Sequence, residues 1–348
     1  MALRIATITY ATHQGLGHLA RSFCEAGVVT DPVIFRHNHY PTHTEWYPSN
    51  TPLVSALQRP FAGQEQVQKV LNQVDAFVFF ETPFDWTFLS ACRNRKVKTV
   101  LVPMYEWTPR RWPDRPDLLA CPSLLDLDFF KAGSIPAVHL PIPVDPNLWQ
   151  KRTRALRYLH NAGHIGHRQH KGTLELLKAV QHLRSNLTLT VRCQDQGPFQ
   201  GLLRTVPGIE KDPRVTFEYG DKSQEELWAN YDVYVAPEKF NGLSLPIQEA
   251  RAAGLLVMTT DRYPANTWLP RAPLLPAARY EPACISQNYL EFEEAIVEPA
   301  AIAATMDAWH GRDISEYSLS GKRWAEENSW EALKPRWLEA IEHALVSR

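Results

Sequence analysis

The chain has 348 residues, of which 44% are hydrophobic and 22% are charged, and its 37 lysines and arginines nearly balance its 38 aspartates and glutamates. This length suits two domains of ordinary size, and the composition argues against a disordered or membrane-embedded chain. The near-neutral charge argues against binding to nucleic acid through overall charge, so a polyanionic partner requires a local basic patch.

The chain begins with a short apolar run at 3–10, interrupted by Thr7, Thr9 and Tyr10. This pattern predicts a buried strand and lacks the core and cleavage site of a signal peptide. No later stretch approaches the roughly 20 apolar residues that span a bilayer. The five cysteines are scattered and form no C-x-x-C pair, which argues against a disulfide framework or a zinc site. We therefore expect a cytoplasmic protein.

Short apolar runs alternate with helical patterns along the chain. The first half predicts helices at 17–27 and 84–96, and strands at 3–10, 75–80 and 97–103. After a proline-rich stretch at 140–149 the alternation restarts, with strands predicted near 155–163, 187–193, 214–220, 232–237 and 255–260. Such alternation is typical of parallel sheets covered by helices on both faces. We expect an α/β protein with two lobes.

The expected domains are an N-terminal one at 1–145 and a C-terminal one at 146–322. The last segment reads as amphipathic helix, with tryptophans and aliphatic residues at helical spacing. We expect the helix at 323–348 to pack back on the N-terminal domain.

The segment from His160 to Gly172 runs from a predicted strand end into the start of a helix. It combines backbone N–H groups freed by glycines with the charges of Arg168 and Lys171. Together these features predict a cradle for a diphosphate. A solvated basic loop is one alternative. A metal site formed by the four histidines is another, although their spacing matches no defined zinc pattern.

The segment from Phe240 to Gly254 places a glycine turn before a helix that carries Glu249. A carboxylate on the first turns of a helix is favoured in its ionised form and can accept hydrogen bonds from two ribose hydroxyls. The N–H groups of the turn are expected to face a phosphate or a sugar. The alternative is a capped surface helix with a solvated glutamate.

These motifs resemble those of the GT-B glycosyltransferases, in particular family 4. Members carry a glycine-rich first loop, a valine-aspartate linker, a basic K-G loop and an E-G-F-G-L-P-x-x-E-A motif, in this order. The corresponding segments here are GLGHLARS at 15–22, LPIPVDPNLW at 140–149, HKG at 170–172 and NGLSLPIQEARAAGLLV at 241–257.

The resemblance implies the GT-B fold, in which two Rossmann-like domains face each other across a cleft. It implies a retaining, metal-independent transferase that needs no cofactor and uses a nucleotide sugar, with UDP favoured as the carrier and GDP and ADP left open. Lys171 and Arg168 would hold the donor diphosphate, and Glu249 the ribose. The other implied donor-site residues are Gly15, Gly17, Gly163, His164, Asn241, Gly242, Leu243, Ser244 and Leu245.

Two positions depart from the family pattern. Asn241 stands where the family's first glutamate contacts the donor sugar, which leaves the identity of the sugar open. The family's histidine in the N-terminal lobe is replaced by Tyr105 or Glu106 in VPMYEW, at the corresponding strand end. The broken carboxylate pair keeps open a catalytically silent nucleotide-sugar-binding protein, and the fold keeps open a sugar-nucleotide epimerase.

The acceptor remains open between a glycan, a small molecule and a modified nucleic-acid base. Basic residues lie beside tryptophan at 93–98 and 108–116, a pattern that suits a phosphorylated or nucleic-acid acceptor or simply solvated charge. The acidic triplet at 126–128 is interpreted as a solvated helix face, and the histidines at 37–43 as a polar loop. No metal site is predicted.

Overall fold

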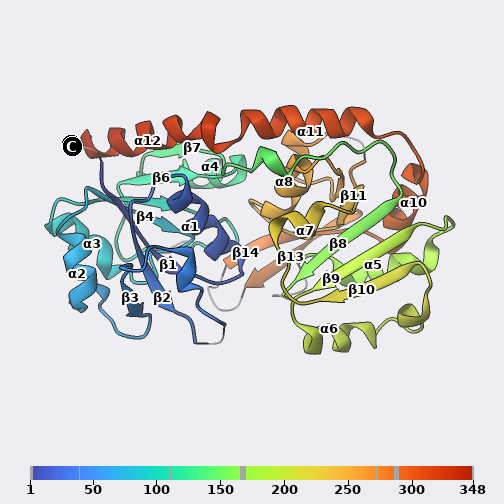
Figure 1. Cartoon of the computed structure of the whole chain (residues 1–348), viewed down its shortest axis with the longest axis horizontal. Coiled ribbons are helices and arrows are strands. Elements are labelled where there is room, and N and C mark those ends of the chain that lie inside the picture. Colours follow the sequence, from blue (N-terminus) through green and yellow to red (C-terminus); the bar gives the residue numbers. More distant parts are fainter. Residues whose placement is uncertain are drawn as a thin grey trace. The chain divides into compact units, whose positions relative to one another are not determined.

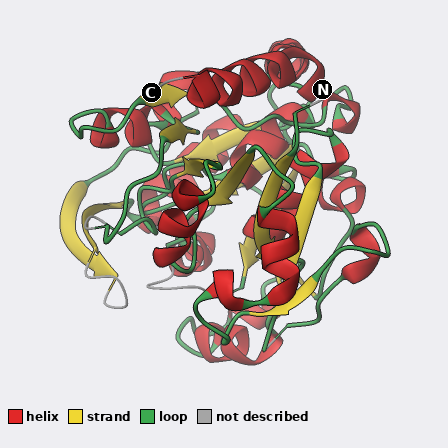
Figure 2. Cartoon of the chain, turned by 90° about the vertical axis from the view of Figure 1, so that its left-hand side faces the viewer, coloured by secondary structure: helices red, strands yellow, loops and turns green. Residues whose placement is uncertain are grey.

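The computed structural model describes residues 3–38, 40–109, 112–164, 170–270, 273–285 and 290–346. It divides the chain into two compact units. The N-terminal unit comprises Met1–Ile142 with Trp330–Arg348, and the C-terminal unit comprises Pro143–Ser329. Each unit contains a parallel sheet with helices packed against it (Figures 1 and 2). The prediction of two Rossmann-like α/β domains is confirmed.

The sheet of the N-terminal unit has seven parallel strands in the order β3-β2-β1-β4-β5-β6-β7. All five residues of β4 are buried, as expected for a strand covered on both faces. The strands are β1 (Ile5–Tyr10), β2 (Asp31–Arg36), β3 (Leu53–Ser55), β4 (Ala76–Phe80), β5 (Lys98–Val102), β6 (Leu118–Cys121) and β7 (Ala137–His139). The helices are α1 (Gly15–Glu25), α2 (Glu65–Leu71), α3 (Thr87–Asn94), α4 (Leu124–Phe130) and α12 (Trp330–Val346).

The last helix, α12, belongs to the N-terminal unit although it comes from the other end of the chain. Its Trp337 is fully buried and packs edge-on against Phe23 of α1, with ring centroids 4.8 Å apart. The indole Nε1–H of Trp337 donates a hydrogen bond of 3.1 Å to the carbonyl oxygen of Pro141. The preceding helix, α11 (Ser315–Glu327), is counted instead with the C-terminal unit, so the last segment divides near residue 329.

Trp337→Ala is expected to destabilise the protein by about 3–5 kcal/mol, because it removes a fully buried aromatic side chain and leaves a cavity. Chemical denaturation followed by intrinsic fluorescence measures the change. The exposed Val346, replaced by alanine at the end of the same helix, serves as the control and should leave the unfolding midpoint nearly unchanged. A midpoint for Trp337→Ala equal to the wild-type one would contradict this packing.

The main sheet of the C-terminal unit has five parallel strands in the order β10-β9-β8-β11-β12, and β13 and β14 form a separate antiparallel pair. The strands are β8 (Arg157–Gly163), β9 (Thr188–Cys193), β10 (Val215–Tyr219), β11 (Val233–Ala236), β12 (Leu256–Thr259), β13 (Arg279–Ile285) and β14 (Leu290–Ile296). The helices are α5 (Thr173–Ala179), α6 (Gln196–Leu203), α7 (Gln224–Trp228), α8 (Leu245–Ala252), α9 (Ala265–Trp268), α10 (Pro299–Trp309) and α11.

Both parallel sheets have a point where the strand order reverses. In the N-terminal unit this point lies between β1 and β4, and in the C-terminal unit between β8 and β11. Open α/β sheets bind their ligands in the crevice outside the carboxyl ends of the strands at such a point. The topology therefore directs attention to the loops after β1, β4, β8 and β11. Within the described residues, no helix is long and apolar enough to cross a bilayer.

Candidate functional site

The loops that follow β8 and β11 touch each other at the carboxyl edge of the C-terminal sheet. The N–H of Lys239 donates a 2.7 Å hydrogen bond to the carbonyl oxygen of His170. Gly172 has φ of +68°, and a Cβ there would overlap the carbonyl oxygen of Pro237. A glycine is required on both counts. The K-G motif and the motif that begins after β11 thus form one site at the switch point.

Two ion pairs with opposite polarity connect the β11 loop to the K-G motif and to α5, the helix that follows it. The ammonium Nζ of Lys171 lies 2.8 Å from Oε1 of Glu238, and Nζ of Lys239 lies 2.9 Å from Oε1 of Glu175 in α5. The Glu238 side chain is only 1% exposed, and that of Lys171 is 17% exposed. Lys171, which the sequence predicts to bind a diphosphate, therefore lies at the site and is paired there with a buried carboxylate.

Glu238 is charged in this environment. Burial raises the pKa of its carboxyl group, but the neighbouring charge of Lys171 and its hydrogen bond, together with His170 and Arg262, outweigh burial and hold the pKa below its ordinary value. The carboxylate and the ammonium therefore form a true ion pair at neutral pH, in a place where an isolated charge would be costly.

Asn241 closes the turn that leads into α8. Its side-chain oxygen Oδ1 accepts hydrogen bonds from the N–H groups of Leu243 at 3.1 Å and Ser244 at 2.7 Å. Its backbone carbonyl accepts a hydrogen bond from the guanidinium of Arg262. The expectation that the N–H groups of this turn face a ligand is therefore wrong for Leu243 and Ser244, because a short amide side chain satisfies them locally.

Glu249 lies on α8, and Ser244 precedes the helix with a left-handed backbone. Burial raises the pKa of the Glu249 carboxyl group to about 7, although interactions with the side chains of Gln224 and Trp228 in α7 lower it in part. The expectation that the ionised form of this group is favoured on the first turns of the helix is thus not met. Loss of hydration outweighs the dipole, whose effect is concentrated in the first turn.

This shift makes stability depend on pH. Because the pKa of Glu249 is higher in the folded protein than its ordinary value of 4.5, ionisation on going from pH 5 to pH 8 costs folding stability. Glu249→Gln removes this cost and should be more stable than the wild type by about 2–3 kcal/mol at pH 8. The advantage should shrink toward pH 5. Thermal unfolding of both proteins across this range measures it, and a pH-independent difference would contradict the shift.

The residues at the end of β8 have distinct roles. Gly163 has φ of +64°, and Nδ1 of the next residue, His164, lies 2.7 Å from a carboxylate oxygen of Asp195. His160 is not part of a phosphate cradle. It is fully buried, with Nδ1 2.7 Å from the carbonyl oxygen of Val235 and Nε2 2.9 Å from the hydroxyl of Thr173. Burial lowers its pKa to about 4, so it is a neutral core residue. Arg168 lies outside the described residues.

In the N-terminal unit, the glycine-rich motif forms the start of α1. Gly15 is the first residue of the helix. A Cβ on Gly17 would overlap the backbone oxygen of Thr12. The visible reason for glycine at position 17 is therefore close packing of the helix against the end of β1, at the switch point of this sheet.

Tyr105 and Glu106 follow β5, as expected from the sequence. The Tyr105 ring packs edge-on against Phe129 with centroids 5.2 Å apart. Glu106 is buried and lies near two further carboxylates, Glu81 after β4 and Asp126 in α4.

These carboxylates change each other's protonation. Burial, with the charge of Glu106, raises the pKa of Glu81 to about 8. Burial also raises the pKa of Asp126 to about 7, partly opposed by hydrogen bonding with Ser123. The interpretation of the acidic triplet as a solvated helix face is wrong for Asp126, which is fully buried and has its N–H capped by the Ser123 hydroxyl.

The basic segments of the N-terminal unit are partly neutralised. Arg93 pairs with Asp114 at 2.7 Å and Lys98 with Asp117 at 3.3 Å, so solvated and paired charge describes them better than an open patch. The cations at 110 and 111 lie outside the described residues. In the histidine-rich loop, His43 stacks on Trp46 with centroids 4.9 Å apart. No cluster of metal-ligating side chains able to hold an ion was found in the described ranges.

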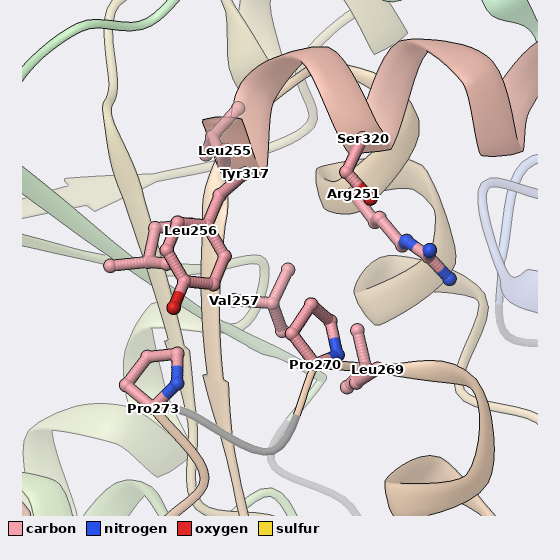
Figure 3. Close-up of a pocket in the computed structure, with 9 residues that line it drawn as sticks. All are labelled: Arg251, Leu255, Leu256, Val257, Leu269, Pro270, Pro273, Tyr317 and Ser320. Carbon is pink, nitrogen blue, oxygen red and sulfur yellow. The ribbon is translucent and has the colours of Figure 1, made fainter. Parts of the chain in front are cut away.

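A small pocket is lined by residues of α8, β12 and α11, with neighbouring loop residues (Figure 3). Its volume is about 10 Å³, enough for about one water molecule. Arg251, which lines it, packs over the Trp324 ring at 4.5 Å and donates to the carbonyl oxygen of Trp268. This pocket therefore belongs to the packing of α11 on α8 and is not a substrate site.

Sequence reasoning missed three charged residues that lie within three residues of the ends of buried strands. Glu81 directly follows β4, whereas Glu238 lies two residues beyond β11 and Arg262 three residues beyond β12. The signal was available, since charged residues shortly after predicted strands lie at the carboxyl edge of a parallel sheet. It could not indicate which of them pair with one another.

Residues 157–269, within the C-terminal unit, match the family model described as Glycosyl transferases group 1. No curated protein matches the chain in sequence.

Solved structures resemble the chain over its whole length. A glycosyltransferase from Rickettsia africae ESF-5 has a TM-score of 0.72 at 11% identity, covering 100% of both chains. HepE from Anabaena, solved with UDP-glucose, has a TM-score of 0.70 at 11% identity, covering 98% of this chain and 100% of HepE. Sucrose-phosphate synthase from Thermosynechococcus elongatus has a TM-score of 0.67 at 13% identity, covering 98% and 99%.

At such low identity these structures establish the fold, which is GT-B as predicted. The family match independently identifies a glycosyltransferase group 1 region in the C-terminal unit. The prediction from the motifs that this chain resembles the GT-B glycosyltransferases is confirmed. Its narrower placement in family 4 stays a prediction.

Proposed function

We propose that this protein is a retaining glycosyltransferase that moves a sugar from a UDP-sugar to a hydroxyl acceptor. The observation that carries the proposal is the contact, at the β8/β11 switch point, between the K-G loop and residues 237–239, which lead directly into the Asn241–Glu249 segment. This edge of a parallel sheet is where such folds bind nucleotides. The HepE structure was solved with UDP-glucose, which supports UDP as the carrier here.

In this proposal, Lys171 stabilises the negative charge that develops on the diphosphate as the bond to the sugar breaks. Glu249, once ionised, accepts hydrogen bonds from the ribose hydroxyls and fixes the nucleotide. The acceptor hydroxyl attacks the anomeric carbon on the face from which the diphosphate leaves. A phosphate oxygen takes the hydroxyl proton, so that UDP is released and no protein nucleophile is required.

Tyr105 and Glu106 are proposed to lie on the acceptor side, with the acceptor itself open between a glycan, a small molecule and a modified nucleic-acid base. We further propose that the protein works in a reducing cytoplasm. In support, Cys24, Cys92, Cys121 and Cys193 are free thiols.

Release of nucleoside diphosphate tests the proposal. The protein is incubated with a panel of nucleotide sugars, with and without candidate acceptors, and the diphosphate and the sugar products are quantified. Acceptor-dependent release with retention of the anomeric configuration is expected. Binding without turnover would instead indicate a silent nucleotide-sugar-binding protein, and conversion of the sugar without release would indicate an epimerase.

Turnover is expected to continue in EDTA, because the cationic side chain of Lys171 and the backbone supply the positive field that a divalent metal would otherwise provide. Initial rates with excess EDTA, with added Mg²⁺ and with added Mn²⁺ are compared. Equal rates within about two-fold are expected. Loss of activity in EDTA that Mn²⁺ restores would overturn the expectation.

A further inference from the structure

The pairing of Lys171 with Glu238 has a functional consequence. Glu238 is almost completely buried, and Lys171 is mostly buried, with their charged atoms 2.8 Å apart. The other side chains that affect Glu238, His170 and Arg262, also lower its pKa. The carboxylate is therefore held in its ionised form beside the Lys171 ammonium, beyond the carboxyl end of β11.

A mostly buried ammonium needs a negative partner, because an uncompensated charge in such a place is strongly unfavourable. In the nucleotide-free protein Glu238 is that partner. A bound diphosphate would bring further negative charge to the same ammonium. The carboxylate and the diphosphate then repel each other and compete for one cation.

We propose that Glu238 is a positioning residue that serves as the counter-ion of Lys171 in the empty site and, by competing with the diphosphate, limits how tightly the nucleotide is held. This inference rests on the proposed function, since it takes the diphosphate to bind beside Lys171. Its consequence for catalysis is easier release of the product nucleotide. Glu238 thus lowers the affinity for the nucleotide and thereby speeds the release of the product.

The neighbouring pair provides a structural comparison. Lys239 and Glu175 are 2.9 Å apart, and both side chains are partly buried, so this pair also contains one cation and one carboxylate. It joins the β11 loop to the body of α5 instead of to the K-G motif. When the Lys171–Glu238 contact is changed, two contacts therefore remain to hold the β11 loop in place. They are the Lys239–Glu175 ion pair and the hydrogen bond from the N–H of Lys239 to His170.

Glu238→Gln tests the proposal, because the amide keeps the shape and one acceptor oxygen but removes the charge. Affinities for UDP, inorganic pyrophosphate and uridine are measured by calorimetry on the full chain. UDP and pyrophosphate should bind about ten-fold more tightly to the variant, while uridine, which carries no phosphate, should bind equally. UDP should dissociate correspondingly more slowly, and kcat should fall if product release limits turnover.

Two further variants separate charge from structure. Glu238→Asp keeps the charge and should bind UDP within about two-fold of the wild type. In the Lys171→Met background, the cation for which Glu238 and pyrophosphate compete is gone, so adding Glu238→Gln should no longer raise the affinity for pyrophosphate. A gain in affinity that persists without Lys171 would overturn the counter-ion role.

The outcomes also distinguish this inference from the proposed function. Weaker or unchanged diphosphate binding by Glu238→Gln would refute competition. Tighter pyrophosphate binding by the variant, without UDP binding by any form, would uphold the counter-ion role and refute the proposed UDP donor. Failure of the wild type and the variant to bind either probe would overturn both.

Discussion

Glu249→Ala is expected to weaken UDP binding by roughly ten- to a hundred-fold, corresponding to about 1.5–3 kcal/mol, while the protein stays folded. The alanine removes the acceptor of both ribose hydroxyls. Folding survives because Glu249 is only partly buried and its ionised carboxylate is itself unfavourable there, as its pKa of about 7 indicates. Calorimetry with UDP measures the loss, and wild-type affinity in the alanine variant would refute the ribose assignment.

Glu249→Gln is the matched control, because its amide oxygen still accepts one hydrogen bond. It should bind UDP more tightly than the alanine variant and more weakly than the wild type at pH 8. Because the ribose hydroxyls donate to the ionised form, wild-type affinity should be lost as the pH falls through about 7. The terminal phosphate of UDP itself titrates near pH 6, which also makes UDP affinity depend on pH. In the glutamine variant only this phosphate contribution remains. The difference between the two profiles isolates Glu249.

Lys171→Ala is expected to have two effects. It should weaken UDP binding by roughly ten- to a hundred-fold, because a charge-assisted phosphate contact contributes about 1.5–3 kcal/mol. It should also destabilise the nucleotide-free protein by about 3–5 kcal/mol, because the buried Glu238 carboxylate loses its partner. Calorimetry and urea unfolding measure the two effects.

Lys239→Ala is the control for Lys171→Ala, since it breaks the adjacent pair with Glu175. It should reduce stability but change UDP affinity little. Uridine affinity should be the same in both lysine variants and the wild type. If Lys171→Ala lost stability but kept full UDP affinity, Lys171 would be a purely structural partner of Glu238 and would leave the proposed site.

Much of the fold follows from local patterns. The apolar run at 75–80 predicts a strand buried on both faces, and β4 is such a strand. Gly172 was expected between a loop and a helix, and its positive φ and contact with Pro237 give the physical reason. Alternation of strands and helices requires crossover connections, so parallel sheets follow from chain order alone.

Long-range pairing and burial could not be derived in this way. The sequence indicates Lys171 and Glu249 as candidates, but Lys171 and Glu238 are 67 positions apart in the chain, and only the adjacency of β8 and β11 brings their loops together. The same holds for the pKa of Glu249, because α7 and α8 meet through tertiary packing. Helix position alone predicts an ionised carboxylate, whereas burial in the folded protein raises its pKa and the contacts with α7 lower it only in part. The sequence by itself therefore determined which charged residues are available near the site. Which of them pair, and which are ionised, was decided by the folded structure.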